Sequence, residues 1–485
     1  MVVSPARFHV FSLVLASTLL ASLTARAQTP EPTPAPEVAP APPPVAAPSS
    51  EPAPVRNTAP NDLRPPASVV PTIPPPAPAP VVPVVASEPP GEGTARNARP
   101  NELPSRKSKE SSKFVIASAD DRHRLEFHAL FDGDGRWFLT DKGGVSTFLI
   151  RRARPSIDAR LFKYLELTLQ PEFAGSKFQI LDAYGNLRFL GEVQFRAGKM
   201  KPPVGLERLQ SSRDTFFPET SLASQLVPNR DLGAQLHGNV GNGTFEWAVG
   251  LFNGVPNGQV GEQDNNDSKD VEGRLFFQPF IPANVPALRG LGFGIAGTIG
   301  NQQGAAVAYQ TAGQTQFFTY ASTATALGKR TLLTPQAYYY AGPFGAMFEY
   351  VRVDEHWVNP LGARATVGSV AWQLTLAAAI GGEETFRGVQ VKHPIDPGNG
   401  DFGAFEIGGR YSDLRVGDLA FERGFANKNT SAQRATEWGV VGTWHLATWN
   451  HLRIAYDNTS FRGGAAHGGN KKTESLIDTR LQIAF

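Results

Sequence analysis

The sequence predicts an all-β protein: a sixteen-stranded antiparallel transmembrane β-barrel, preceded by a signal peptide and a disordered proline-rich segment. Three observations lead to this fold class. The first 27 residues have the pattern of an export signal, sixteen later segments alternate apolar and polar residues, and Phe485 ends the last of these segments. Successive side chains of a strand point to opposite faces, so each segment has one apolar and one polar face. In a membrane barrel the apolar face meets lipid and the polar face meets water.

Residues 1–27 are interpreted as a signal peptide. A weakly basic start precedes a mostly apolar run at 10–23 that is too short to span a bilayer comfortably. Small residues at 25 and 27 form a cleavage pattern, so the mature chain is expected to begin at Gln28; an uncleaved anchor is the alternative. No other stretch reaches the roughly 18 apolar residues of a spanning helix. A membrane protein with this sequence must therefore be a barrel, because only helices and closed barrels satisfy the backbone in lipid.

Residues 28–112 are predicted to form a disordered linker in the periplasm. Of the 41 prolines in the chain, 25 fall between Pro30 and Pro104. Proline has no backbone donor and favours the extended polyproline conformation, so this composition opposes a packed domain.

Residues 113–485 are predicted to form the barrel, because short alternating segments recur there between turns rich in Gly, Asn, Asp and Pro. The sixteen segments lie near 121–138, 145–161, 164–174, 178–190, 193–201, 230–240, 244–254, 269–280, 290–301, 331–342, 344–357, 369–383, 404–416, 435–447, 451–461 and 474–485. Long connections should face the exterior and tight turns the periplasm. The connection 384–403 is long where parity predicts a periplasmic turn. A soluble β-sandwich with its apolar face inward is the alternative fold.

Arginine is frequent on the polar faces of the predicted strands. An arginine on the lipid face near the membrane midplane costs roughly 2–4 kcal/mol, so the arginine-bearing faces should line the lumen. Arg151 falls on the outward side of its segment and is expected near an interface, or shifted by a bulge. A guanidinium stays charged and presents a planar donor fork to oxyanions. The strand residues predicted to line the pore and bind anions are Arg151, Arg152, Arg154, Arg160, Arg188 and Arg196. Alternatively, about half of these arginines pair with nearby acids and only stiffen the wall.

The long connection 202–229 is the second candidate for an anion path. The residues at or in this connection that are predicted to line the pore are Lys201, Arg208, Ser211, Ser212 and Arg213. Glu207, Asp214 and Glu219 lie in the same connection and would weaken a positive field. The sequence therefore favours a preference for small anions and leaves phosphate selectivity open.

An ordered set of motifs resembles the phosphate-selective porin O/P family over about residues 121–485. The set comprises FLIRRARPSID, GKMKPPVGLE with the following SSR, PNRDLGAQLHG, LFNG, AFEIGGRYSDL and HLRIAYDN. The resemblance implies a sixteen-stranded outer-membrane channel, usually trimeric, with an inward-folded loop that forms a basic constriction. By position, Arg151 and Arg152 match the arginine pair of the family and Arg213 matches a constriction residue. Inward-folded periplasmic segments of the family would explain 384–403, whereas the proline-rich spacer and the acidic loop residues depart from its pattern.

These features predict an outer-membrane porin of a Gram-negative-type bacterium: a passive channel for small anions, phosphate or polyphosphate among them, that forms a homotrimer. One alternative is a structural barrel whose proline-rich arm contacts the cell wall. The other is a barrel-embedded hydrolase that uses Ser211, Ser212 or Ser221 with His237. We expect no enzyme activity and no nucleic-acid partner. The chain has no cysteine and its histidines are scattered, so we expect no metal site or cofactor.

Overall fold

The computed structural model describes residues 114–140, 144–175, 178–261, 264, 266–283, 285–305 and 307–485. The predicted signal peptide, 1–27, and the predicted linker, 28–112, lie outside the described residues. No helix in the described part of the chain is long and apolar enough to cross a membrane.

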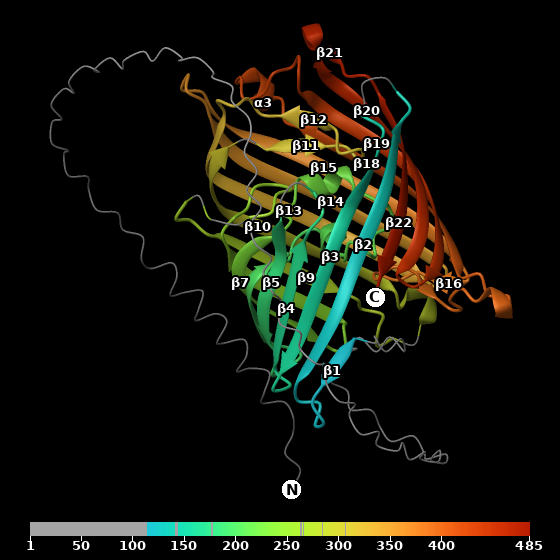
Figure 1. Ribbon diagram of the computed structural model, residues 1–485. Helices are drawn as coiled ribbons and strands as arrows, with labels where there is room; N and C mark the ends of the chain where they lie inside the picture. The colour runs from blue at the N-terminus through green and yellow to red at the C-terminus, as the bar shows by residue number, and fades with distance from the viewer. Residues whose placement is uncertain are drawn as a thin grey trace, which may run out of the picture. The chain divides into compact units, whose positions relative to one another are not determined.

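Sixteen strands of the described residues close into one antiparallel barrel, and the predicted fold class is confirmed (Figure 1). The last strand pairs with the first from Leu130↔Ala484 to Phe138↔Leu476, and this pairing closes the ring. The barrel strands are β2 Arg124–Phe138, β3 Thr147–Leu161, β4 Leu165–Glu172, β5 Gln179–Leu187, β6 Gln194–Met200, β7 Asp231–Val240, β8 Phe245–Phe252, β9 Asp270–Phe277, β10 Leu291–Ala305, β13 Thr325–Ala341, β14 Phe344–Val358, β15 Arg364–Ile380, β18 Ala404–Val416, β19 Ala432–Ala447, β20 Asn450–Ala465 and β22 Glu474–Ala484.

Shorter strands and helices lie at the ends of the barrel strands and in the connections between them. β1 extends the sheet beside the start of β2, and β21 pairs with the end of β20. The other two strand pairs, β11–β12 and β16–β17, form small hairpins of their own. These elements are β1 Val115–Ala117, α2 Leu206–Leu209, η2 Leu222–Gln225, η3 Pro286–Leu288, β11 Ala308–Gln310, β12 Gln316–Thr319, β16 Gly382–Glu383, β17 Gln390–Val391, η4 Pro397–Asn399, α3 Leu419–Glu422, η5 Ala466–Gly468 and β21 Gly469–Asn470.

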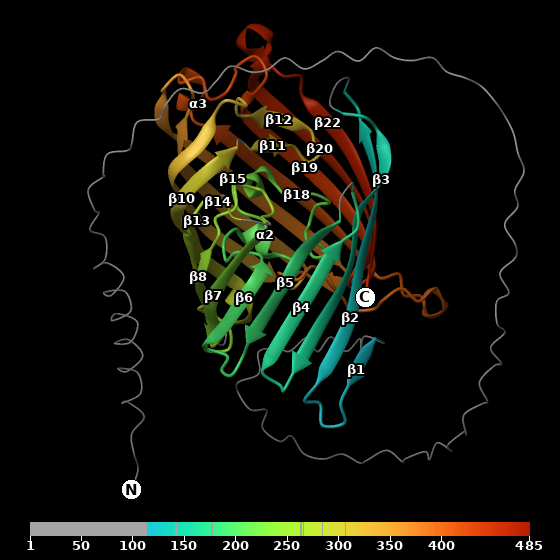
Figure 2. The same cartoon turned by 60° about the vertical axis from the view of Figure 1, so that its left-hand side comes forward.

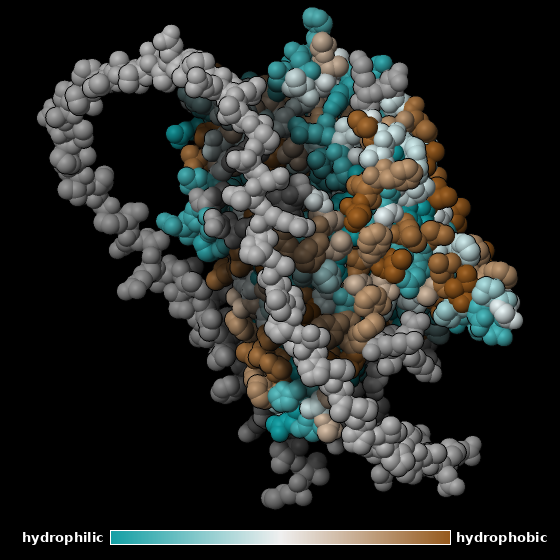
Figure 3. All heavy atoms as spheres, in the orientation of Figure 1, coloured by the Kyte–Doolittle hydropathy of each residue, from teal (hydrophilic) through white to brown (hydrophobic). Residues whose placement is uncertain are grey.

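The alternation of the strands separates an apolar outer wall from a polar lumen. In β14, Met347, Glu349 and Val351 are buried on the inner face, whereas Phe348 is 39% exposed on the outer face. Figure 3 shows hydrophobic residues across the middle of the visible wall and hydrophilic residues toward its loop-side end. The tight turns and Phe485 share one end of the barrel, which we call the turn side; the other end is the loop side. In outer-membrane barrels the short turns face the periplasm.

The loop-side half of the lumen is partly filled by an apolar core. The barrel strands from β13 to β20 have 13–17 residues each, whereas those from β4 to β9 have 7–10. The inner face of the long strands packs against η2 and the β11–β12 hairpin. Tyr320 stacks on the fully buried Trp357 with 3.8 Å between ring centroids. This packing fills the loop-side part of the lumen along the long strands.

The connection 381–403 lies on the turn side, as strand parity predicts, and its first part folds inward. Phe386 packs on Tyr338 of β13, with 5.4 Å between ring centroids. Nε2 of Gln210 donates a hydrogen bond to the Phe386 carbonyl at 3.0 Å. From residue 392 to 400 the segment is exposed. Its inward part therefore supports the long connection between β6 and β7 from the turn side.

Glu384 in this inward part predicts a pH-dependent stability. Its two carboxyl oxygens are buried without a hydrogen-bond partner among the described residues. Burial, together with the negative charge of Glu406, raises the pKa of the Glu384 carboxyl to about 9. The unfolded chain therefore loses this proton first as the pH rises from 5 to 9, so stability falls over that range.

We expect Glu384→Gln to match the wild type at pH 5 and to be more stable at pH 9 by at least about 1 kcal/mol. Urea unfolding of the detergent-solubilised barrel at several pH values measures this difference. Glu383→Gln is the matched control, because Glu383 is exposed and pairs with Lys392 at 3.1 Å. Equal pH profiles of the Glu384→Gln variant and the wild type would contradict the assignment.

Candidate functional site

The connection between β6 and β7, residues 201–230, folds into the barrel and crosses the lumen (Figure 2). On one side, the Leu206 amide donates to Oε1 of Glu349 on β14 at 2.7 Å. On the other, Nε2 of Gln482 on β22 donates to the Arg213 carbonyl at 3.0 Å. The connection thus contacts two parts of the wall that lie five strands apart in the ring, and we call it the constriction loop.

Local sequence gives the constriction loop its compact form. Gly205 has φ 82°, a backbone conformation that L side chains rarely adopt, and it precedes the single turn α2. The buried Glu207 carboxylate then accepts hydrogen bonds from the Ser221 amide, the Ser221 hydroxyl at 2.6 Å and the Ser224 hydroxyl at 2.7 Å. Glu207 therefore holds the two halves of the loop together and faces the loop itself.

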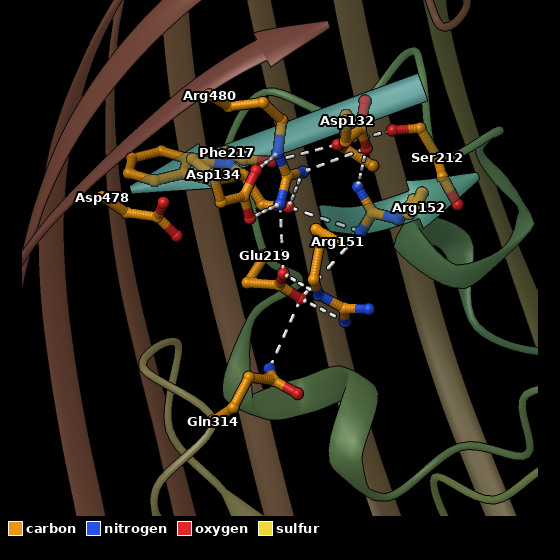
Figure 4. Close-up of polar contacts among 12 residues, drawn as sticks. Asp132, Asp134, Arg151, Arg152, Ser212, Phe217, Glu219, Gln314, Asp478 and Arg480 are labelled. Atoms are coloured by element: carbon orange, nitrogen blue, oxygen red, sulfur yellow. Dashed lines mark hydrogen bonds and ion pairs between the residues drawn. The ribbon is translucent and has the colours of Figure 1, made fainter. Parts of the chain in front are cut away.

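Glu219, in the second half of the loop, is the centre of a buried ionic network (Figure 4). Its carboxylate accepts from Arg151 at 2.6 and 3.0 Å, from Arg136 at 3.0 Å and from Arg480 at 3.2 Å, and Arg152 lies 3.9 Å away. Burial alone would raise the pKa of Glu219, but the charges of Arg151, Arg152 and Arg480 hold it well below its usual range. The carboxylate is therefore ionised, and it ties the loop to β2, β3 and β22.

Strand carboxylates complete this network. Arg152 donates to Asp132 at 2.6 Å, and Arg480 donates to Asp134 at 2.7 Å through each of two nitrogens. Asp478 lies 3.6 Å from the Arg136 guanidinium. The network thus contains four arginines, at 136, 151, 152 and 480, and four carboxylates, at 132, 134, 219 and 478. Its formal charges balance, so the arginine pair of β3 anchors the loop and adds no net positive charge to the lumen.

Arg151 enters the lumen because β3 has a bulge at this residue. Asp132 pairs with Arg152 and Gly133 pairs with Ile150, so Arg151 is the extra residue of the bulged strand. A bulge re-aims a side chain relative to the regular alternation. This geometry agrees with the second of the two expectations for Arg151, a shift by a bulge.

A cavity of about 560 Å³ lies on the turn side of the loop, against β2–β6. Its charged lining residues are Arg124, Arg154, Arg160, Arg188, Arg196, Lys201, Arg213 and Arg230, with Glu126, Asp158, Glu166 and Asp182. Eight cationic side chains therefore face four carboxylates. Ser211, Ser212 and Tyr184 add hydroxyl groups to the lining. Such a lining can attract anions and offer them several donors.

Four of the predicted pore residues meet within this cavity and make ion pairs or hydrogen bonds there. Arg154 donates to Glu172 at 2.5 Å and to the Ser212 hydroxyl at 2.7 Å. Arg188 pairs with Glu166 at 2.9 Å, and Arg160, toward the turn-side end, pairs with Asp121 at 2.8 Å. These contacts agree with the expectation that part of the arginines pair with acids, while Ser211 lines the same cavity.

Other predicted residues of the cavity have fewer acidic neighbours. The Arg196 guanidinium lies over the Tyr184 ring at 4.8 Å, and no carboxylate of the described residues pairs with it. Lys201 donates to the Gln210 carbonyl at 2.5 Å, and burial and the charge of Arg230 lower the pKa of its ammonium group. Arg213 lies over the Trp449 ring at 4.1 Å, with Asp214 3.6 Å away.

Three predicted residues lie outside the lining of this cavity. Arg151 and Arg152 belong to the Glu219 network, and Arg208 donates to the Ser224 carbonyl at 2.6 Å within the loop. Sequence reasoning did not select Arg230, which lines the cavity and lies 3.3 Å from Asp182, or the acids of β2. Alternation indicated the inward direction of the β2 acids, but neither the position of Arg230 nor the pairing across the lumen carried a sequence signal.

A closed barrel with an inward loop and a charged lumen is the structure of an outer-membrane porin, a passive diffusion channel. The chain belongs to the family of phosphate-selective porins O and P, whose family model matches residues 124–485. Family and fold together indicate a channel rather than an enzyme. The family also indicates that the protein is located in the outer membrane.

No curated protein matches the chain significantly. Among solved structures, OmpT of Vibrio cholerae is 12% identical over 76% of this chain and 100% of its own, with a TM-score of 0.48. The anion-selective porin from Comamonas acidovorans is 13% identical, covers 75% of this chain and 100% of its own, and has a TM-score of 0.46. The channel DcaP of Acinetobacter baumannii is 8% identical, covers 76% and 99%, and has a TM-score of 0.49.

Proposed function

We propose that this porin prefers small anions over cations and that the cavity beside β2–β6 is the selective part of its path. The observation that carries this proposal is the lining of eight cations against four carboxylates. A cavity lined mainly by one sign of charge raises the local concentration of the opposite ion. Water is partly excluded from a narrow path, so each charge acts at a lower effective dielectric constant than in bulk.

The proposed anion contacts are Arg154, Arg160, Arg188, Arg196, Lys201, Ser211, Ser212 and Arg213. Several moderate sites suit transport better than one tight site, because an ion must also leave. Phosphate would gain from the guanidinium forks, whereas chloride responds mainly to charge. The pair Arg151 and Arg152 is balanced by carboxylates. General anion preference therefore ranks above phosphate selectivity in this proposal.

The test is a reversal potential across planar bilayers that hold the wild-type porin under a tenfold potassium chloride gradient. A potential of the sign set by chloride is expected, and potassium phosphate in place of chloride ranks the two anions. We also expect the anion preference to weaken as the pH rises, since the lowered pKa of Lys201 lets this residue lose its charge earlier than an exposed lysine. A channel that prefers potassium would overturn the proposal.

We propose in addition that the porin assembles as a homotrimer. The outer wall carries an apolar hollow of about 430 Å³, lined mainly by Ile157, Ala159, Leu167, Leu169, Ala183, Gly185 and Ala197. Small residues permit close approach of a second wall, which supports contact between protomers here. The mass of the detergent-solubilised complex tests this assembly.

For the N-terminal part we propose that 1–27 is a cleaved signal and that 28–112 is a periplasmic linker able to contact the cell wall. Its proline content supports an extended spacer. Mass spectrometry of the mature chain and limited proteolysis of the arm test these two assignments. An arm as protected as the barrel would contradict the second.

A further inference from the structure

A row of arginines crosses the outer wall near the loop-side end of the long strands. In the cross-strand register, Arg352 on β14 is opposite Val370 on β15, and Val370 is opposite Arg415 on β18. Arg434 on β19 and Arg462 on β20 continue the row. Arg415 is directly opposite Arg434, and Arg434 is directly opposite Arg462. These side chains point away from the lumen, because their neighbours in each strand, such as Leu414 and Ala435, are buried inside.

Like charges directly opposite each other destabilise a sheet, so a row of this kind needs compensation. Three of the four arginines have an acidic neighbour: Arg352 with Asp354 at 2.8 Å, Arg415 with Asp418 at 2.8 Å and Arg434 with Asp413 at 2.7 Å. Arg462 has no ion pair in the described part of the chain. The guanidinium-bearing side chains of Arg352, Arg415 and Arg434 remain 47–55% exposed, so solvent screening leaves the pairs weak and the donors accessible.

The position of the row matches the outer edge of the lipid. Tyr411 on β18 and Trp438 on β19 are directly opposite each other. The ring centroid of Trp372 lies 5.3 Å from that of Tyr411, and the ring centroid of Tyr456 lies 5.4 Å from that of Trp438. Aromatic side chains of this kind gather toward the membrane–water interface, within the outer part of the apolar band. Arg415 is four residues from Tyr411 along β18, and Arg434 is four residues from Trp438 along β19. Both arginines lie on the loop side of these aromatic residues.

The height of the apolar wall agrees with this placement. Phe405, near the turn-side end of β18, is ten residues from Arg415. Ten residues span roughly 33 Å along a strand, or about 25 Å along the axis at a tilt near 40°. Since the apolar band of such barrels is about 25 Å tall, the arginines lie at the level of the headgroups.

A polar hollow of about 250 Å³ adjoins Arg462 on the loop side. Lys428, Ser431, Gln433 and Asn470 line it together with Asp418, Glu422 and Phe421. Amide, hydroxyl and carboxylate groups are suited to hydrogen bonds with sugar hydroxyls. The lysine adds a further positive charge beside the row.

We propose that this surface binds the phosphorylated sugar headgroup of a glycolipid in the outer leaflet. Neighbouring strands are about 4.8 Å apart, so Arg415, Arg434 and Arg462 place three planar donor forks within reach of one or two phosphate groups. The hollow then receives a sugar ring, and the aromatic side chains of Tyr411 and Trp438 contact the acyl chains. Phosphate between the arginines removes the repulsion of the directly opposed charges.

The test measures binding of bisphosphorylated lipid A and of its dephosphorylated form to the full-length porin by native mass spectrometry in detergent. Wild-type porin is expected to bind the phosphorylated form at least tenfold more tightly. The triple variant Arg415→Gln, Arg434→Gln, Arg462→Gln should bind it at least tenfold more weakly than wild type. A lysine triple at the same positions should fall between these values, because an ammonium group keeps the charge and lacks the fork.

The matched control removes three exposed cations at the turn side: Lys163→Gln, Arg387→Gln and Lys392→Gln. It should change the affinity by less than twofold, and the folded variants of the row should keep the wild-type conductance, since the row is outside the lumen. Equal affinity of wild type and glutamine triple, or of both lipid A forms for wild type, would overturn the proposal. Equally tight binding of phosphatidylglycerol would overturn the glycolipid assignment. If the glutamine triple variant fails to fold, two measurements still test the proposal: the affinity of wild type for the two forms of lipid A, and the affinity of the lysine triple variant for the phosphorylated form.

Discussion

Replacing Glu219 with glutamine is expected to release the constriction loop and to destabilise the barrel. The substitution leaves Arg136, Arg151, Arg152 and Arg480 with one carboxylate fewer in a buried cluster. Removing one partner of a buried ion pair costs about 3–5 kcal/mol, mostly because uncompensated charge stays behind. A freed loop should widen the path, raise the single-channel conductance and add current noise.

Planar-bilayer recordings and urea unfolding measure these two effects. Glu422→Gln is the matched control, since Glu422 is an exposed carboxylate of α3 on the loop side. The control should retain the wild-type conductance and stability. If Glu219→Gln kept both properties as well, the network would have no part in positioning the loop.

Charge reversal at Arg196 should give the largest loss of anion preference. This side chain lines the cavity over Tyr184, and no acid of the described residues pairs with it. Arg196→Glu changes the charge by two units. About 8 Å from the ion path this raises the energy of an anion by roughly 1 kcal/mol even at the dielectric constant of water and lowers that of a cation by the same amount. The anion-to-cation permeability ratio should therefore drop by at least about fivefold.

The reversal potential under a salt gradient measures this ratio for wild type and variant. Arg289→Glu is the control, because Arg289 is exposed on the turn-side connection between β9 and β10 and is not among the lining residues of the cavity. Its ratio should stay near the wild-type value. Equal shifts in the two variants would indicate a general effect of protein charge and would contradict the assignment of the cavity.

Much of the barrel could be predicted because strand alternation is a local property. The inward direction of Arg152 and Arg480 follows from their place in β3 and β22, and each sequence segment contains that information by itself. The even number of strands and the turn-side position of 381–403 follow from counting segments. Arg151 could be predicted only in part. The sequence showed that Arg151 lies on the outward side of its segment, and the structure shows that a bulge in β3 turns its side chain into the lumen.

The partners of the charged side chains could not be predicted in this way. Glu219 is 68 residues from Arg151 and 261 residues from Arg480, and they meet because the loop folds back across a closed ring. Sequence reasoning treated Glu219 as an acid that weakens the positive field of the loop. The structure instead uses it to neutralise the arginine pair, and the excess positive charge lies in the cavity beside β2–β6.

The amino-acid sequence by itself determined the barrel, its strand number, the polar and apolar faces and the identity of the long loop, because each depends on residues that are neighbours along one or two strands. Only the tertiary structure decided which cations remain available to an ion. Arg196 and Arg152 look alike in sequence, since both lie on inward faces of predicted strands. Arg152 contacts Asp132 and lies near Glu219, whereas Arg196 stacks on Tyr184 at the edge of the cavity. The field of a lumen depends on distances between distant strands and an inward loop, and the closure of the ring sets those distances.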